Sequence, residues 1–471
     1  MKVNSSLSPY FWSFLNTGGS QILSIIGTMI IARIALPTDF GVIAVCAIII
    51  MLVNIFSELG LTNLIILEKE ISQKKISTVF WIINFLAFIY FFTVIFSTNA
   101  IATYFDIEKI KIALPIMAVS ILSNSLGAVH SAMVTRNLEF KKKAVVSIVS
   151  SLIALILGVV IAINIDPLIG LAILLSLGPL LITIGLRFII NLKIRFIFDK
   201  NYLYERFKVS NNFFFSSLID QLNRLFIISF INGKFGTFDL GLFNRAEAVR
   251  NITTLTLDKI IQRVSFPVLS KKNLEEKKLL IFEHLNISSG IILISFPLIY
   301  FVYRFSTEIM TILFGINFSM AGEILEIIIL GGFFIPLTSL NLSLLKSSGY
   351  SLSMLINKII NCSLIIFLIF FLKNIEIGNF LILLNFVFFF SFLISIISIT
   401  KVFHDHFFKY ISIILLSSIM SSLPIIVFNI LPMIVIENSL LDLFVNFLTI
   451  TILMLFTILT FLKFNPLRLN D

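Results

Sequence analysis

Long apolar runs follow one another along almost the whole chain, with short polar segments between them. Each run is long enough for an α-helix to cross a hydrocarbon core about 30 Å thick. The alternation over about ten residues that is typical of a membrane β-barrel is absent from the sequence. The pattern therefore predicts fourteen membrane-spanning helices. They cover residues 10–34, 41–66, 77–99, 111–135, 144–165, 168–190, 207–232, 239–268, 285–303, 319–345, 351–372, 378–400, 409–430 and 440–462.

The composition agrees with this pattern. Of the 471 residues, 58% are apolar and only 13% are charged, whereas soluble domains carry about 25% charged residues. We therefore expect an all-α polytopic membrane protein. Its two cysteines, Cys46 and Cys362, lie inside apolar runs, so neither a disulfide framework nor redox chemistry is expected. The first run lacks a convincing cleavage site and is expected to be a retained helix instead of a signal peptide.

Basic residues are distributed unevenly among the predicted loops. The loops after even-numbered helices, with both tails and the adjoining helix edges, hold 23 of the 35 Lys and Arg residues, and the loops after odd-numbered helices hold 6. Short loops rich in Lys and Arg stay on the cytoplasmic side. Both termini are therefore expected in the cytoplasm. The same bias explains the net charge of +10 without nucleic-acid binding.

The stretch 207–272 differs from its surroundings because charged residues interrupt two runs of membrane-spanning length. A charged side chain at the bilayer centre costs about 2.5–3.5 kcal/mol, so the second of these helices, at 239–268, cannot face lipid. If it did not span the membrane, every later loop would change sides, and the basic cluster at 271–278 would lie outside. We therefore expect it to span, shielded by protein or water.

Two hairpins 200 residues apart have related sequences. The segment IIARIALPTDFGVIAV begins at Ile30, and its counterpart SFINGKFGTFDLGLFNRAEAV begins at Ser229. Asp39 and Gly41 of the first hairpin correspond to Asp239 and Gly241 of the second. Each hairpin opens a unit of six helices, as in transporters built from parallel repeats.

The repeat predicts the organisation of the chain into four parts. These are a six-helix bundle at 1–190, a cytoplasmic linker at 191–206, a second six-helix bundle at 207–400 and two additional helices at 401–471. The two bundles are expected to have the same orientation, because six is an even number of spans.

These motifs resemble a known family. IARIALPTDFGVIAV…NIFSELGLTNLII, RNLEFKKKA, FGTFDLGLFNRAEAV…VSFPVLS and LTSLNLSLLKSSGYSLSMLINKII are similar to the polysaccharide-exporting oligosaccharide flippases of the colanic-acid exporter type. That family belongs to the multidrug/oligosaccharidyl-lipid/polysaccharide superfamily. The resemblance extends over about residues 10–400.

The resemblance implies two six-helix bundles around a central cavity. It also implies movement of an undecaprenyl-diphosphate-linked oligosaccharide from the cytoplasmic to the outer leaflet, as a repeat unit of O-antigen, capsule or exopolysaccharide. Helices 13 and 14 are similar to a pair that gives lipid II flippases a groove for the lipid tail. Implied partners are the lipid-linked oligosaccharide, membrane lipids, a polysaccharide polymerase and a chain-length regulator.

Such a cargo is a dianionic diphosphate with sugars attached, so its site needs cations and hydrogen-bond donors. Arginine suits a diphosphate because its guanidinium forms two parallel hydrogen bonds. At about 100° per residue, Arg263 shares a helix face with Arg245 and Lys259, whereas Arg250 lies on the other side near Glu247. The predicted substrate-binding residues are Arg250, Arg245, Arg224, Lys259 and Asn223.

Structural roles remain open for the same residues. Arg250 can form an internal ion pair with Glu247, and Asp220 can pair with Arg224 four residues later. The basic residues near the end of the second charged helix can act as cytoplasmic anchors. The first charged helix nevertheless offers a polar wall suited to a sugar path, formed by Asn211, Asn212, Gln221 and Asn223.

Acidic residues inside apolar spans are candidates for ion coupling, because an intramembrane carboxylate is expensive to keep without a function. The three candidates are Glu58, Asp220 and Asp258. For Glu58, hydrogen bonding to Asn54 or Ser57 is the structural alternative. The sequence contains no GxxxxGK[ST], HExxH or Gly-rich nucleotide motif. We therefore expect no catalytic residue, metal or cofactor, and transport that is downhill or coupled to Na⁺ or H⁺.

Two other functions compete with lipid-linked oligosaccharide export. A cation-coupled small-molecule or drug antiporter of the same superfamily would usually have twelve helices and an acidic site for cationic cargo. A membrane glycan polymerase or glycosyltransferase would typically place catalytic residues on a long outer loop. The loops predicted on the outer side are short, so an enzyme is not expected. His404, Asp405 and His406 lie in a short cytoplasmic loop and are not expected to bind metal.

Overall fold

The computed structural model describes residues 7–67, 71–137, 139–190, 192–271, 277–347, 350–371, 375–402, 407–430 and 439–463. For some helical residues it describes the helix but not the side chains. These are residues 7–11, 13–17, 63–64, 67, 200–213, 255–271, 277–280, 346–347, 351, 402, 407–409, 430, 439 and 461–463. The described ranges contain helices and connecting segments, and no strand occurs in them. The prediction of an all-α protein is confirmed.

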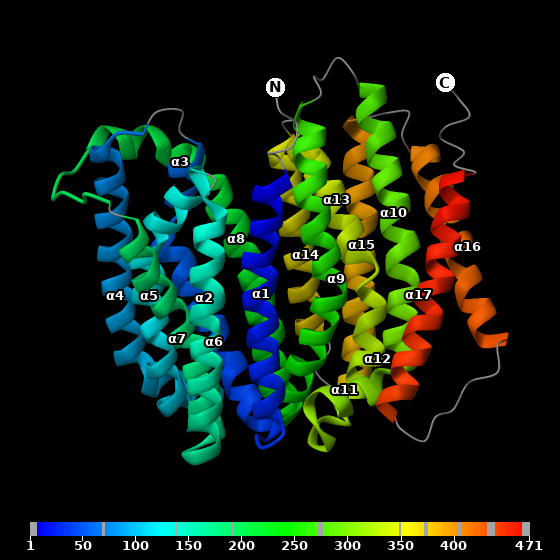
Figure 1. Ribbon diagram of the computed structural model, residues 1–471, viewed down its shortest axis with the longest axis horizontal. Coiled ribbons are helices and arrows are strands. Elements are labelled where there is room, and N and C mark those ends of the chain that lie inside the picture. The colour runs from blue at the N-terminus through cyan, green and yellow to red at the C-terminus, as the bar shows by residue number, and fades with distance from the viewer. Residues whose placement is uncertain are drawn as a thin grey trace. The chain divides into compact units, whose positions relative to one another are not determined.

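The helices follow one another with short connections along the chain (Figure 1). They are α1 Leu7–Ala32, α2 Pro37–Glu58, α3 Leu61–Leu67, α4 Gln73–Phe105, α5 Ile110–Arg136, α6 Phe140–Asn164, α7 Pro167–Ile189, α8 Lys200–Phe235, α9 Thr237–Lys271, α10 Lys277–Arg304, α11 Ser306–Phe314, η3 Ile316–Phe318, α12 Ala321–Gly331, α13 Phe334–Ser347, α14 Ser351–Phe371, α15 Ile377–Val402, α16 Phe407–Ile430 and α17 Ser439–Lys463.

Twelve candidate spans among the described residues are long and apolar enough to cross a membrane, so the protein is a multi-pass membrane protein. The predicted number of fourteen is not confirmed. The apolar part of α1 that is described covers only Gly18–Ala32, and α9, with its charged residues, is not among the twelve.

The predicted helix at 41–66 is in fact two helices, α2 and α3. Leu59 and Gly60 have φ values of 47° and 69°, in the left-handed region where a right-handed helix ends. The short α3 then packs against α5, and Arg136 Nη1 donates a hydrogen bond of 2.8 Å to the carbonyl oxygen of Ile65. The predicted helix at 319–345 is likewise divided into α12 and α13, with Gly332 and Phe333 between them.

The first compact unit extends from Met1 to Gly241. Within it α6 packs between α1 and α7, and α5 packs against α2, α4 and α7. The α6–α7 contact depends on small residues. A Cβ at Gly170 would lie 2.4 Å from the Ala162 Cβ and 2.6 Å from the Gly158 carbonyl oxygen, so the two backbones approach closely.

Helix α8 belongs to this first unit, because it packs along α2 and also contacts α3 and α4. The boundary between the two compact units lies at 241/242. The bundles at 1–190 and 207–400 were defined by the sequence repeat, and this organisation stays a prediction.

The second compact unit extends from Leu242 to Asp471. Within it α10 packs against α16 and α17, and α15 packs against α12, α13 and α14. A buried polar network joins four of these helices. Asn341 of α13 accepts hydrogen bonds at Oδ1 from Tyr410 (2.8 Å) and His284 (3.0 Å), and its Nδ2 donates to Ser395 (2.8 Å). All four side chains are buried, so α16 is a tightly bound part of this unit.

Candidate functional site on helices α8 and α9

The two repeated hairpins meet at their glycines, within the first unit. A Cβ at Gly41 of α2 would lie 2.2 Å from the Thr237 carbonyl oxygen, and a Cβ at Gly241 would lie 1.7 Å from the Pro37 carbonyl oxygen. Pro37 and Thr237 are themselves 200 positions apart. The contact is therefore reciprocal, since each glycine admits the first turn of the other helix. No other residue type fits at either position without separating the backbones.

Hydrogen bonds and an ion pair surround this crossing. The buried carboxylate of Asp39 accepts a hydrogen bond from its own helix cap at Leu36 N (3.1 Å) and pairs with Lys109 Nζ at 2.7 Å. The last turns of α8 are held as well, since Asn232 Nδ2 donates to the Phe105 carbonyl oxygen at 2.8 Å. The crossing therefore joins α2, α8 and the connection between α4 and α5.

The middle of α8 carries the polar residues predicted to face a sugar path. Asn223 and Arg224 are half-buried, whereas Asp220 is exposed. Among the described residues, the amide oxygens of Gln221 and Asn223 are buried and have no hydrogen-bond partner. Buried amide oxygens in native proteins nearly always have a partner, so these two are available to a hydroxyl donor. The side chains of Asn211 and Asn212 lie outside the described residues.

Arg250 lies at the centre of a polar cluster in the second unit. Its side chain is buried, with 6% of the residue exposed, and its Nη2 is 3.2 Å from Glu247 Oε1 and 3.4 Å from Asn251 Oδ1. The guanidinium carbon lies 5.5 Å from the ring centre of Phe388 on α15. Gly332, at the corner between α12 and α13, allows close approach, since a Cβ there would lie 3.4 Å from the Arg250 Cγ. The ion pair expected from the spacing of Glu247 and Arg250 is thus present.

The other predicted cations are divided between described and undescribed parts of α9. Arg245 is half-buried, donates to Asn244 Oδ1 at 2.6 Å and lies 5.7 Å from the ring centre of Phe314 on α11. Arg245 and Arg250 therefore contact different aromatic neighbours, as expected for residues on different faces of one helix. The side chains of Asp258, Lys259 and Arg263 lie outside the described residues.

Glu58 ends α2 at the left-handed turn of Leu59 and Gly60. The structural role expected for Glu58 was a hydrogen bond to Asn54 or Ser57. Instead, Ser57 donates to the Val53 carbonyl oxygen, and Glu58 Oε2 accepts a hydrogen bond from Thr62 at 3.5 Å. The turn explains the difference, because it brings the first residues of α3 back towards the end of α2. Glu58 is half-buried in this corner.

Two aromatic partners of the arginines were not found by the sequence analysis. Phe314 and Phe388 lie far along the chain from Arg245 and Arg250, and nothing distinguishes them among the 51 phenylalanines. For metal binding, no group of three or more His, Cys, Asp or Glu side chains that could hold an ion occurs in the part of the chain that the structure describes.

The described residues include apolar spans, a buried arginine ion pair and buried amide oxygens without a hydrogen-bond partner. Polar groups of this kind inside a polytopic α-helical membrane protein are typical of a transporter. Residues 30–322 match the family described as polysaccharide biosynthesis protein, and the chain belongs to that family. The resemblance found in the sequence motifs is thereby confirmed.

Relatives and a solved structure agree with this membership. The chain is 22% identical over 343 residues to the teichuronic acid biosynthesis protein TuaB of Bacillus subtilis, covering 72% of this chain and 70% of that protein. It is 23% identical over 336 residues to the lipopolysaccharide biosynthesis protein WzxC of Escherichia coli, covering 68% and 65%. The lipid II flippase MurJ in an inward closed conformation superimposes with a TM-score of 0.75 at 16% identity, over 96% of this chain and 98% of that one. The MurJ likeness concerns the fold.

Proposed function

We propose that the protein is a flippase that moves undecaprenyl-diphosphate-linked oligosaccharide repeat units across the bacterial cytoplasmic membrane by alternating access. Family membership and the fold shared with MurJ support this proposal. The observation that carries it is the buried Arg250 cluster, which offers a guanidinium, a neighbouring amide and an aromatic surface. These are the groups that a sugar-linked diphosphate requires.

Arg250 holds the diphosphate in this proposal, and Glu247 is the counter-ion that Arg250 has in the absence of cargo. A guanidinium binds phosphate oxygens through two parallel charge-assisted hydrogen bonds, about twice as strong as neutral ones. The ring centre of Phe388 lies 5.5 Å from the guanidinium carbon, close enough for a cation–π contact that favours the charged side chain at this position. When cargo binds, the diphosphate therefore replaces the Glu247 carboxylate as the anion beside Arg250. Arg250 then has an anionic partner both with and without cargo, so its charge is never buried alone.

The α8 amides recognise the sugar part of the cargo in the same proposal. A sugar hydroxyl would supply the hydrogen bond that the buried oxygens of Gln221 and Asn223 lack among the described residues. A site built for hydroxyl donors rejects cargo without them, because its own polar groups would then stay unsatisfied. Arg224, Arg245 and Lys259 are proposed as further contacts to the anionic part of the substrate.

Energy coupling and assembly complete the proposal. Transport is downhill or coupled to Na⁺ or H⁺, with Glu58, Asp220 and Asp258 as the coupling carboxylates. Both termini lie in the cytoplasm of the cell, as the Lys and Arg bias indicates. A polysaccharide polymerase and a chain-length regulator are the proposed protein partners, and the protein itself carries out no chemical step.

The proposal is tested by reconstituting the purified protein into vesicles with a fluorescent polyprenyl-diphosphate oligosaccharide. A glycosidase added outside cleaves only the outer-leaflet pool in protein-free vesicles, and we expect wild-type protein to make the inner pool cleavable as well. Arg250→Gln protein serves as the matched control and should leave the inner pool protected. An inner pool that stays protected with wild-type protein contradicts the proposal, and uptake of a cationic dye by the same vesicles would favour the antiporter.

A further inference from the structure

The segment between α7 and α8, residues 192–199, is bound along the first turns of α4, and we refer to it as the α4 strap. Gln73 donates a hydrogen bond to the Lys193 carbonyl oxygen. Ser77 Oγ accepts from the Arg195 N–H at 3.1 Å, and Trp81 Nε1 donates to the Arg195 carbonyl oxygen at 3.1 Å. In all three cases the strap contributes backbone atoms, so the side chains of Lys193 and Arg195 are not needed to hold it.

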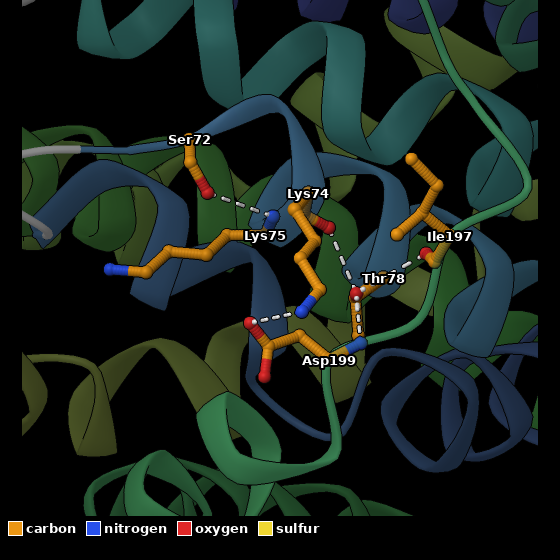
Figure 2. Close-up of polar contacts among 6 residues, drawn as sticks. All are labelled: Ser72, Lys74, Lys75, Thr78, Ile197 and Asp199. Atoms are coloured by element: carbon orange, nitrogen blue, oxygen red, sulfur yellow. Dashed lines mark hydrogen bonds and ion pairs between the residues drawn. The ribbon is translucent and has the colours of Figure 1, made fainter.

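The end of the strap is fixed in the same way (Figure 2). Thr78 Oγ1 accepts from the Asp199 N–H at 2.9 Å and donates to the Lys74 carbonyl oxygen of its own helix at 2.8 Å, with the Ile197 carbonyl oxygen a more distant neighbour at 3.5 Å. The Asp199 carboxylate lies 3.6 Å from Lys74 Nζ. Four residues of the strap, from Lys193 to Asp199, are therefore attached to the first three turns of α4, and the last two contacts return to Thr78 and Lys74.

The two faces of the strap differ in chemistry. Leu192 and Ile194 pack against the buried cluster that contains Val79, Phe80 and Ile83. The side chains of the other face are exposed. They are Lys193, Arg195, Phe196, Ile197 and Phe198, of which Phe196 has 87% of its surface exposed.

Aromatic residues on α4 locate the strap relative to a bilayer. Trp81 and Tyr104 are both exposed and lie about 35 Å apart along the helix, at about 1.5 Å per residue. Between them the large exposed side chains are apolar, namely Phe85, Phe88, Ile89, Phe92 and Phe96. The exposed polar side chains in this stretch are small, and Asn99 and Thr103 lie near its Tyr104 end. Trp and Tyr gather at the two edges of a hydrocarbon core about 30 Å thick. Trp81 therefore marks one edge, and the ring of Phe196 lies against it at 4.9 Å.

We propose that the α4 strap is a binding surface for anionic phospholipid headgroups. Lys193 and Arg195 contact the headgroup phosphates, while Phe196 and Phe198 lie in the interfacial layer beside Trp81. The charge of the strap side chains is complementary to an anionic leaflet, and the lipid-facing surface of α4 leads directly into the strap. Basic residues near such a surface enrich anionic lipid about fivefold each. The inference concerns a different surface from the proposed cargo site and does not depend on the cargo.

Trp81 provides the test, because the chain has two tryptophans and Trp12→Phe leaves Trp81 as the single reporter. The full-length variant is reconstituted into vesicles of equal phosphatidylglycerol and phosphatidylcholine, with one or the other brominated on the acyl carbons nearest the headgroup. We expect brominated phosphatidylglycerol to quench Trp81 about twofold or more above brominated phosphatidylcholine. The excess should decrease at about 0.5 M NaCl, because salt screens exposed charges.

Neutralising the two strap cations gives the decisive comparison. Lys193→Gln with Arg195→Gln should bring the quenching ratio to near one while Trp81 stays attached to the strap backbone. Lys111→Gln, an exposed lysine at the start of α5, is the matched control and should leave the ratio unchanged. Equal quenching by the two lipids in the Trp12→Phe protein overturns the proposal. So does the absence of quenching by either lipid, which would indicate a strap covered by protein or water. If the strap variant does not fold, the Trp12→Phe protein alone still tests the proposal. Excess quenching by brominated phosphatidylglycerol that does not decrease at about 0.5 M NaCl would overturn it.

Discussion

At the scale of single residues, polar side chains inside this protein are stabilised in two different ways. Arg250 and Glu247 carry opposite charges one helical turn apart, so burial of each is compensated by the other. Asn341 instead makes hydrogen bonds to His284, Tyr410 and Ser395, each from a different helix. An arginine that is paired with a carboxylate can exchange it for another anion, whereas the Asn341 amide already uses its oxygen and its nitrogen to join helices. We therefore propose binding for the first cluster and helix attachment for the second.

The Asn341 network should make a measurable contribution to stability. Tyr410→Phe removes one buried hydrogen bond, for an expected loss of about 1 kcal/mol. Asn341→Leu removes three buried hydrogen bonds at once and should destabilise by more. Tyr300 is the control, because its hydroxyl also donates to an amide, Asn429 Oδ1 at 2.7 Å, but at an exposed site. Thermal unfolding of the purified protein should rank the variants in the order Tyr300→Phe, Tyr410→Phe and Asn341→Leu, from least to most destabilised.

At the scale of helices, the contact between α2 and α9 depends on backbone approach instead of side-chain packing. Gly41 and Gly241 each lie against a carbonyl oxygen, and a carbonyl oxygen cannot move aside as a flexible side chain can. The first turns of the two helices therefore approach more closely here than any side chain larger than that of glycine would allow. By the topology expected from the basic residues, this crossing lies on the outer side of the membrane.

Alanine at either glycine should hold α2 and α9 apart. Overpacking of this kind costs about 1–3 kcal/mol, so we expect Gly41→Ala and Gly241→Ala to reduce glycan export about tenfold or more per folded molecule. Gly233→Ala is the matched control, because nothing lies within 4 Å of a Cβ at that nearby glycine. If Gly241→Ala exports as much glycan as Gly233→Ala, export does not require the close approach of the first turns of α2 and α9.

Sequence patterns predicted some of these elements for clear physical reasons. Membrane thickness determines the length of an apolar run, so the spans could be located, and the spacing of Glu247 and Arg250 on one helix predicted their ion pair. The repeat identified Gly41 and Gly241, although not that they would touch. The break of α2 had a signal in Gly60, whose φ of 69° suits glycine, but the apolar run continues through it and therefore predicted a single span. The Asn341 network and the α4 strap were missed because they join residues far apart in the chain, partly through backbone atoms.

At the scale of the whole molecule, the chain divides into two compact units at Gly241 and Leu242. The first unit includes α8, and the second includes α16 and α17, with α16 attached through Tyr410. Orientation in the membrane rests on the distribution of basic residues, which makes it directly testable.

Reporter fusions should establish this orientation. We expect a reporter after Gly236 to be active outside, and reporters after Lys272 and after Asp471 to be active inside. The physical reason is the concentration of Lys and Arg in the loops assigned to the cytoplasm. An outside signal at Lys272 would mean that α9 does not cross the membrane, and Arg250 would then lie outside any transport path.

The central claim is that Arg250 binds the diphosphate of a lipid-linked oligosaccharide, and glycan export normalised to membrane abundance tests it most directly. Lysine keeps the charge but loses the two-pronged hydrogen bonding, so export should decrease in the order wild type, Arg250→Lys and Arg250→Gln. The decisive variant combines Arg250→Gln with Glu247→Gln, which removes both charges of the pair. We predict a protein of normal abundance that does not export. Full recovery of export by this double variant would contradict the claim, since Arg250 would then serve only to neutralise Glu247.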